Sequence, residues 1–209
     1  MTEAEWLACG DPEPMLEFLR GWASDRKLRL FAVACCRKAW AWLAGHEKFA
    51  VIAVEEYAEG NGRIPLTDTF RHNSLVCAVC SPNALSAAYR TAVNASAAVA
   101  TTAKGYAPQA DPEEWRVADA AETQGQSALM RCIFGNPFRP VAADPRWLTS
   151  PVLDLARAMY DGRDFGPMTV LADALEEAGC GEPDVLAHCR GDGPHARGCW
   201  VVDLVVGKT

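Results

Sequence analysis

The sequence lacks the features that mark exported and membrane proteins. Its acidic start, residues 1–6, has no basic stretch followed by an apolar one, so no signal peptide is predicted. Apolar runs such as residues 28–36 and 96–103 fall far short of the roughly twenty residues that a membrane span needs. We therefore expect a cytoplasmic protein with no membrane partner.

Positive charge is also scarce. Lys and Arg number 20 against 27 Asp and Glu, which gives a formal net charge of −7. Nucleic-acid backbones are bound by clustered positive charge, so no nucleic-acid partner is expected. No complete catalytic, cofactor or nucleotide-binding signature is present either, and no catalytic residue is predicted. Half of the residues are hydrophobic, which is an ordinary globular balance.

The cysteines do not suggest a disulfide framework. Their number, nine, is odd, and several lie within helical patterns. In a chain without an export signal, free thiols in a reducing compartment are expected. The positions are Cys9, Cys35, Cys36, Cys77, Cys80, Cys132, Cys180, Cys189 and Cys199.

What the sequence does contain is a succession of helix signals. Leu28, Phe31, Cys35, Ala39 and Trp42 recur at three- and four-residue spacing, which predicts one buried helical stripe. Further helices are predicted by N-cap, proline and glycine signals along the chain. The fold class expected is therefore all-α: a compact, multi-helix, bundle-like domain, or two packed helical lobes.

Three segments are harder to interpret. Residues 61–82 are broken by proline and asparagine and predict a loop with one short element, and residues 106–110 predict a linker. The last run, 199–206, fits a strand or a helix; we favour a helix because nothing else offers a sheet. The proline-stiffened connector 136–140 divides the prediction into helical lobes 1–135 and 136–209, which are expected to form one cooperative domain.

Parts of the sequence also resemble a known family. The opening MTEAEWL with DRKLRLFAVACCR, the segment IFGNPFRPV and the ending LADALEEAGC with LAHCRGDGPHARGCWVVDL carry the resemblance. They resemble a set of paralogous bacterial proteins of the planctomycete type. The resemblance implies a bacterial cytosolic protein and implies no activity.

A Cys/His cluster near the end of the chain is the sharpest candidate site. His188, Cys189, His195 and Cys199 are four ligand types that zinc prefers, within twelve residues. The spacing matches no standard finger, because adjacent residues such as His188 and Cys189 rarely ligate one ion. Another cysteine, Cys180, Cys35 or Cys36, is an alternative ligand. The competing interpretation is that the cysteines are buried as small hydrophobes and the histidines cap the turn.

Two further cysteine patterns carry weaker signals. Cys77 and Cys80 form a single CxxC pair, which is half a zinc site or a redox motif when it follows a strand. No strand is predicted before it, so burial is favoured. Cys35 and Cys36 lie in the middle of a predicted helix, with one thiol expected in the core and the other at its edge.

Asp203 lies within a strongly apolar run, where a carboxylate is costly to bury alone. We expect it at an exposed edge or paired with Arg197, with Arg190 or a histidine as other partners. If Asp203 were catalytic, it would form an acid–base group with His188 and His195.

A basic stretch on one predicted helix is a candidate face for an anionic partner. The alternative is a solvent-exposed face whose positive charge is compensated by Glu55, Glu56 and Glu59. The basic residues are Arg26, Lys27, Arg29, Arg37 and Lys38.

These observations lead to three functional hypotheses. The first is a non-catalytic helical module that binds another protein and needs no cofactor. The second is a helical domain stabilised by zinc at residues 188–199, and the third is a hydrolase-type enzyme.

Overall fold

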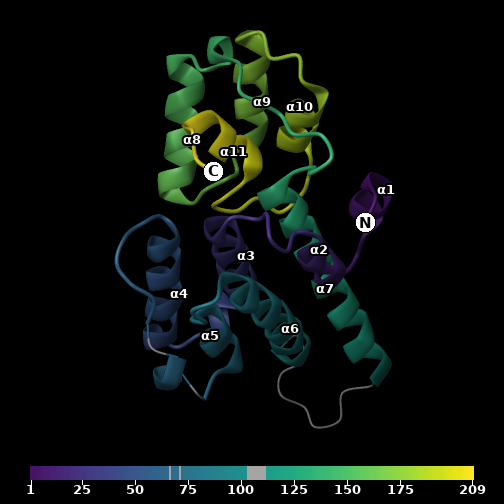
Figure 1. Ribbon diagram of the computed structural model, residues 1–209, viewed down its shortest axis with the longest axis vertical. Coiled ribbons are helices and arrows are strands. Elements are labelled where there is room, and N and C mark those ends of the chain that lie inside the picture. The colour runs from purple at the N-terminus through teal and green to yellow at the C-terminus, as the bar shows by residue number, and fades with distance from the viewer. Residues whose placement is uncertain (66, 71, 103–111) are drawn as a thin grey trace. The chain divides into compact units, whose positions relative to one another are not determined.

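The computed structural model describes residues 1–65, 67–70, 72–102 and 112–209, and those residues form helices and connections without any strand (Figure 1). The expected all-α fold is therefore confirmed for the described part of the chain. The predicted linker 106–110 lies outside the described residues. None of the described helices is both long enough and apolar enough to span a membrane.

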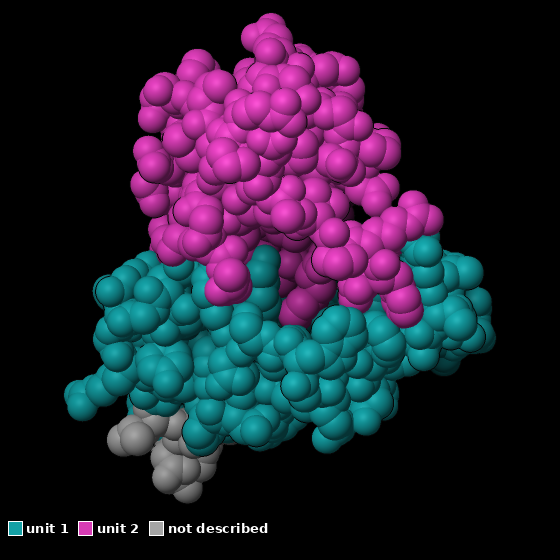
Figure 2. Space-filling view, turned by 45° about the horizontal axis from the view of Figure 1, so that its top comes forward, with its two compact units in different colours: residues 1–130 teal, residues 131–209 magenta. Residues whose placement is uncertain are grey.

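The chain divides into two compact units, residues 1–130 and 131–209, which are coloured separately in Figure 2. The division falls inside one helix, α7 (Pro112–Phe134). The boundary predicted from the sequence lies a few residues later, at the proline-rich connector 136–140, because proline and glycine mark the ends of helices and not the borders between cores.

Unit 1 is built around α3 (Asp25–Lys38). All residues from Leu28 to Cys36 in this helix are buried, and Ser24 caps its start by accepting a hydrogen bond from the Lys27 backbone N–H. Helices α4, α5 and α6 pack around it. Besides α3 and the first part of α7, the elements are α1 (Glu3–Ala8), α2 (Pro12–Phe18), η1 (Trp40–Trp42), α4 (Gly45–Ala58), η2 (Thr67–Phe70), α5 (Ser74–Val79) and α6 (Ala84–Thr102).

Within residues 61–82, the structure contains more order than the sequence indicates. The helix α5 follows Asn73, whose side chain accepts hydrogen bonds from the backbone N–H groups of Leu75 and Val76. Leu75, Val76 and Val79 are buried. Six residues are too few to show a helical period, so Asn73, as a helix-capping residue type, is the main feature of the sequence that indicates α5.

Unit 2 has its own apolar core, to which the end of α7 contributes Cys132. The predicted terminal helix is confirmed as α11 (Trp200–Val206), with Val201, Val202 and Val205 buried. It packs on α8, and α9 packs on α10. The other elements are η3 (Pro145–Trp147), α8 (Ser150–Gly162), α9 (Met168–Glu177) and α10 (Pro183–Arg190).

Candidate functional site

Unit 2 gathers two cysteines and two histidines from four separate positions. Cys132 lies in the last turn of α7, and His188 lies in the last turn of α10. His195 lies in the connection that follows α10, and Cys199 is the N-cap residue of α11. Their four potential ligand atoms all lie within 4.8 Å of one another.

The spacing of these atoms suits a tetrahedral metal ion. His188 Nε2 lies 3.2 Å from Cys199 Sγ, and His195 Nδ1 lies 3.9 Å from Cys132 Sγ. Zinc–ligand bonds of about 2.0–2.3 Å place the corners of a tetrahedron about 3.3–3.8 Å apart. Two thiolates would also neutralise the double charge of Zn²⁺, which makes burial of the ion affordable.

The protein leaves part of this cluster without an internal partner. His195 Nε2 is buried and has no hydrogen-bond partner in the described structure. A buried, unpaired ring nitrogen costs free energy. The ring nitrogen that lies against Cys132 Sγ is Nδ1, so a metal in the cluster would be ligated through Nδ1 and not through Nε2.

The cluster also favours a thiolate at Cys199. Full burial alone would raise the pKa of the Cys199 thiol, but hydrogen bonds from Cys132, His188 and His195 outweigh it and hold the pKa well below its usual value. The thiolate is the form that binds metal.

The structure differs from the predicted ligand set at one residue. Cys189 is fully buried in the apolar core of unit 2 and is not part of the cluster; Cys132 stands in its place. Successive residues on a helix point about 100° apart, so His188 and Cys189 on α10 cannot face one ion together. Burial raises the pKa of Cys189 to about 12, which keeps it a neutral thiol that packs as a small hydrophobe.

Cys132 is the member of the cluster that was not predicted from the sequence, because it is distant in sequence from the other three. Its side chain is 2% exposed and lies at the one end of α7 that belongs to unit 2.

An aromatic side chain supports the cluster from one side. The Trp200 ring is tilted against the His188 ring, with 5.5 Å between centroids. The same indole lies over Gly135, where an added Cβ would be 3.1 Å from Trp200 Cγ. The Gly135 backbone thus leaves room for the tryptophan that packs on His188.

The predicted anionic-partner face is already engaged within the protein. Arg29 is 2% exposed, and its guanidinium donates to the carbonyl oxygens of Ser81 and Pro82 at 3.0 and 2.6 Å. It is therefore part of the core and not of a surface. Of the other members, Arg26, Arg37 and Lys38 form ion pairs with Glu59, Glu55 and Glu122, and Lys27 is half-buried.

Asp203 is buried, with 1% of its surface exposed, so the exposed-edge alternative is wrong. Arg197 lies over the Tyr160 ring, 4.7 Å from its centroid, and Lys208 lies over the same ring at 4.8 Å. The ion pair between Asp203 and Arg197 stays a prediction. A carboxylate at this depth offers a substrate no access, and both histidines of the predicted acid–base group belong to the Cys/His cluster.

The remaining cysteine patterns are those of core residues. Cys35 and Cys36 are both fully buried, so neither lies at a core edge. Burial raises the pKa of both thiols, and it raises the pKa of Cys80 to about 12. Cys77, at the other end of the CxxC pair, is partly exposed.

Comparison with known proteins gave no relative: the chain matches no family model, no curated protein and no solved structure. The resemblance to the planctomycete-type family therefore stays a prediction, and the site must be interpreted from its own geometry.

Proposed function

We propose that this protein is a non-catalytic helical module whose C-terminal unit is held together by a structural zinc ion, bound by Cys132, His188, His195 and Cys199. The observation that carries the proposal is the convergence of two sulfur and two nitrogen ligand atoms within 4.8 Å. Four protein ligands complete a tetrahedron and leave no position for water or substrate, which is the arrangement of structural zinc sites.

The proposed role of the ion is to join segments that are distant in sequence. Cys132 comes from the start of unit 2, and the other ligands come from its last third. Tetrahedral sites with two sulfur and two nitrogen ligands favour zinc among the common divalent ions. Binding free energy at such a site contributes directly to folding free energy.

The test is elemental analysis of the full chain, purified without a metal-binding tag. We expect one zinc per chain in the wild type and close to none in Cys132→Ala. The matched control is Cys189→Ala, which removes a buried thiol from the same unit and should keep its zinc. Loss of zinc in the control and retention in Cys132→Ala would return the site to the set predicted from sequence and contradict the proposal.

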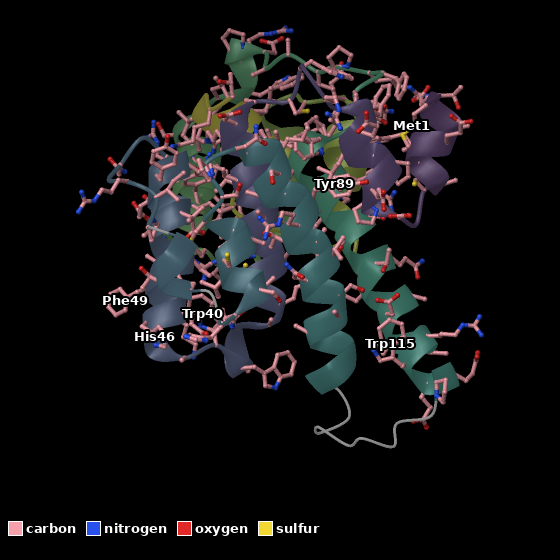
Figure 3. The ribbon with its side chains drawn as sticks, turned by 60° about the horizontal axis from the view of Figure 1, so that its bottom comes forward. Met1, Trp40, His46, Phe49, Tyr89 and Trp115 are labelled. Carbon is pink, nitrogen blue, oxygen red and sulfur yellow. The ribbon has the colours of Figure 1, made fainter. Side chains whose placement is uncertain are left out.

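Binding of another protein remains a second candidate role. It is favoured by apolar side chains left open to solvent in unit 1: Phe49 on α4 is 75% exposed and Trp42 in η1 is 51% exposed. Figure 3 shows Phe49 projecting from α4 near His46. Exposed aromatic residues are typical of protein interfaces.

A further inference from the structure

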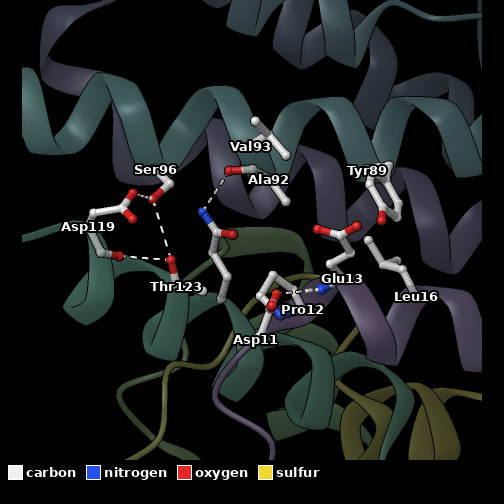
Figure 4. A pocket seen from close by; sticks show the side chains of 11 residues that line it. Asp11, Pro12, Glu13, Leu16, Tyr89, Ala92, Val93, Ser96, Asp119 and Thr123 are labelled. Atoms are coloured by element: carbon white, nitrogen blue, oxygen red, sulfur yellow. Dashed lines mark hydrogen bonds between the residues drawn. The ribbon is translucent and has the colours of Figure 1, made fainter. Parts of the chain in front are cut away.

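A cavity of about 280 Å³ opens in unit 1 between α2, α6 and α7 (Figure 4). At about 30 Å³ per water in the liquid, it has room for roughly nine waters or a small organic molecule. It lies entirely among residues of unit 1 and shares no residue with the Cys/His cluster. Its lining consists of Asp11, Pro12, Glu13, Leu16, Tyr89, Ala92, Val93, Ser96, Asp119, Thr123 and Gln126.

The cavity is rich in acceptors and poor in donors. Three carboxylates line it, Asp11, Glu13 and Asp119, and no Lys, Arg or His is among the lining residues that the structure describes. The Ser96 and Thr123 hydroxyl groups that line the cavity do not supply free donors, because both donate to Asp119. Ser96 donates to the Asp119 carboxylate, and Thr123 Oγ1 donates to the Asp119 carbonyl oxygen at 2.8 Å.

The side chain of Gln126, a buried residue that lines the cavity, is the second, independent sign of a ligand. Gln126 is 1% exposed, and its Nε2 donates to the Ala92 carbonyl at 3.0 Å and to Glu122 Oε1 at 3.2 Å. These two acceptors fix the orientation of the amide. Gln126 Oε1 is left as a cavity-lining acceptor with no hydrogen-bond partner among the described residues. Buried acceptors are rarely left unpaired, so a donor is expected here.

Two of the three acidic side chains lie at opposite ends of the cavity, and the third, Asp11, lies between them (Figure 4). Figure 4 shows Glu13 beside Tyr89 at one end and Asp119 beside Ser96 at the other, with Val93 between the two. The hydrogen bond with Glu13 is the main cause that raises the pKa of Tyr89 to about 12. Tyr89 therefore keeps its proton and presents an aromatic ring next to a carboxylate, a combination that recognises ammonium groups.

We propose that this cavity binds a small unbranched diamine. One ammonium group would bond to Asp119 and Gln126 Oε1, and the other would bond to Glu13 beside the Tyr89 ring. The alkyl chain would lie on the apolar surface of Leu16 and Val93. The two ammonium groups would each face one carboxylate, Asp119 or Glu13, while Asp11 caps α2 by accepting from the Glu13 backbone N–H, and no counter-cation is among the described lining residues.

The test is isothermal titration of the full chain with 1,4-diaminobutane, and with 1-aminobutane and 1,4-butanediol as comparison ligands. We expect the diamine to bind at one site, the monoamine to bind at least about tenfold more weakly, and the neutral diol not to bind, because hydrogen bonds to charged groups carry the affinity. Equal affinity for the monoamine, or binding of the diol, would overturn the proposal. So would Mg²⁺ displacing the diamine, since the site would then hold an inorganic cation.

Variants at α7 provide an independent test. Asp119→Asn removes the charge but keeps an oxygen that accepts from Ser96, and it should raise the dissociation constant of the diamine roughly tenfold to a hundredfold. Glu113→Gln makes the same charge change on the same helix, at an exposed residue that pairs with Arg116 outside the cavity. Its affinity should stay within about twofold of the wild type, because distant surface charges are screened. Equal affinities in the two variants would refute the site, and the comparison of ligands on the wild type decides the case if Asp119→Asn does not fold.

Discussion

At the scale of single residues, Gly135 has two reasons to be glycine. Its φ is +67°, in the left-handed region, and an added Cβ would meet the Trp200 indole. Trp200 in turn packs on the ligand His188. Gly135→Ala should therefore lower the free energy of unfolding by about 1–3 kcal/mol and weaken zinc binding by about tenfold. Urea unfolding and competition with a chromophoric chelator measure the two effects.

The control for this prediction is Gly179→Ala. Gly179 also has a positive φ, +88°, but nothing lies within 4 Å of its added Cβ. It should lose stability through backbone strain alone and keep the zinc affinity of the wild type. If the two variants bind zinc equally well, Trp200 does not position His188.

Cys199 should make the stability of the metal-free protein depend on pH. Its pKa is lowered in the folded state, while a thiol in the unfolded chain titrates near about 8.5. The folded state is then stabilised fully above the unfolded pKa, and this contribution is lost as the pH falls through the lowered folded pKa. Between those two values the free energy of unfolding should rise with pH.

Urea unfolding in a chelator at a series of pH values tests this, with Cys199→Ala as the comparison. The variant should lack the part of the slope that Cys199 contributes. Superimposable pH profiles for the two proteins would show that no thiolate is stabilised at this position.

At the scale of elements, Gly125 lowers the stability of helix α7 but leaves space for the ion pair between Lys38 and Glu122. Glycine inside a helix costs about 1 kcal/mol relative to alanine. Here a Cβ would lie 2.5 Å from Lys38 Nζ, which pairs with Glu122 at 2.7 Å; the Glu122 side chain is only 4% exposed. The gap left by Gly125 lets the lysine from α3 reach that carboxylate.

The effect of Gly125→Ala on the free energy of unfolding should therefore depend on the residue at position 122. In the wild type, displacement of Lys38 leaves a buried carboxylate poorly paired, so the variant should lose stability. In Glu122→Gln, where the lysine is free to move away, the same change should add about 1 kcal/mol through helix propensity. A double-mutant cycle by chemical unfolding measures the difference, and additive effects would contradict the explanation.

The helices were largely predictable because their signals are local. The N-terminal ends of four helices were marked by such signals. Ser24 precedes the apolar stripe of α3, and a proline lies in the first turn of α7, α8 and α10, where the structure begins these helices. The short helix α1 and most of α5 were not predicted, since six residues show too little periodicity.

The site was predictable only in part, for a physical reason. His188, His195 and Cys199 are close in sequence and could be grouped by spacing. Cys132 joins them through the packing of unit 2, which no local pattern records. The exclusion of Cys189, in contrast, follows from helix geometry alone once α10 is assigned.

At the scale of the whole molecule, the two units should respond differently to metal. All four proposed ligands belong to unit 2, so a zinc ion bound there would stabilise that unit by an amount that grows by about 1.4 kcal/mol for each tenfold excess of free zinc over the dissociation constant. Scanning calorimetry of the full chain should show one transition that shifts with zinc and one that does not. A single transition that moves as a whole would mean that the units unfold together.

The distance in sequence between Cys132 and His188 has one more consequence. An ion shared by the two closes a loop of more than fifty residues, comparable with the loops that stabilising disulfides close. Unlike a disulfide, this bridge forms without an oxidant and opens to a chelator. If the proposed site holds zinc, the two distant segments are linked without oxidation of any thiol, and the concentration of free zinc sets the fraction of molecules in which they are linked.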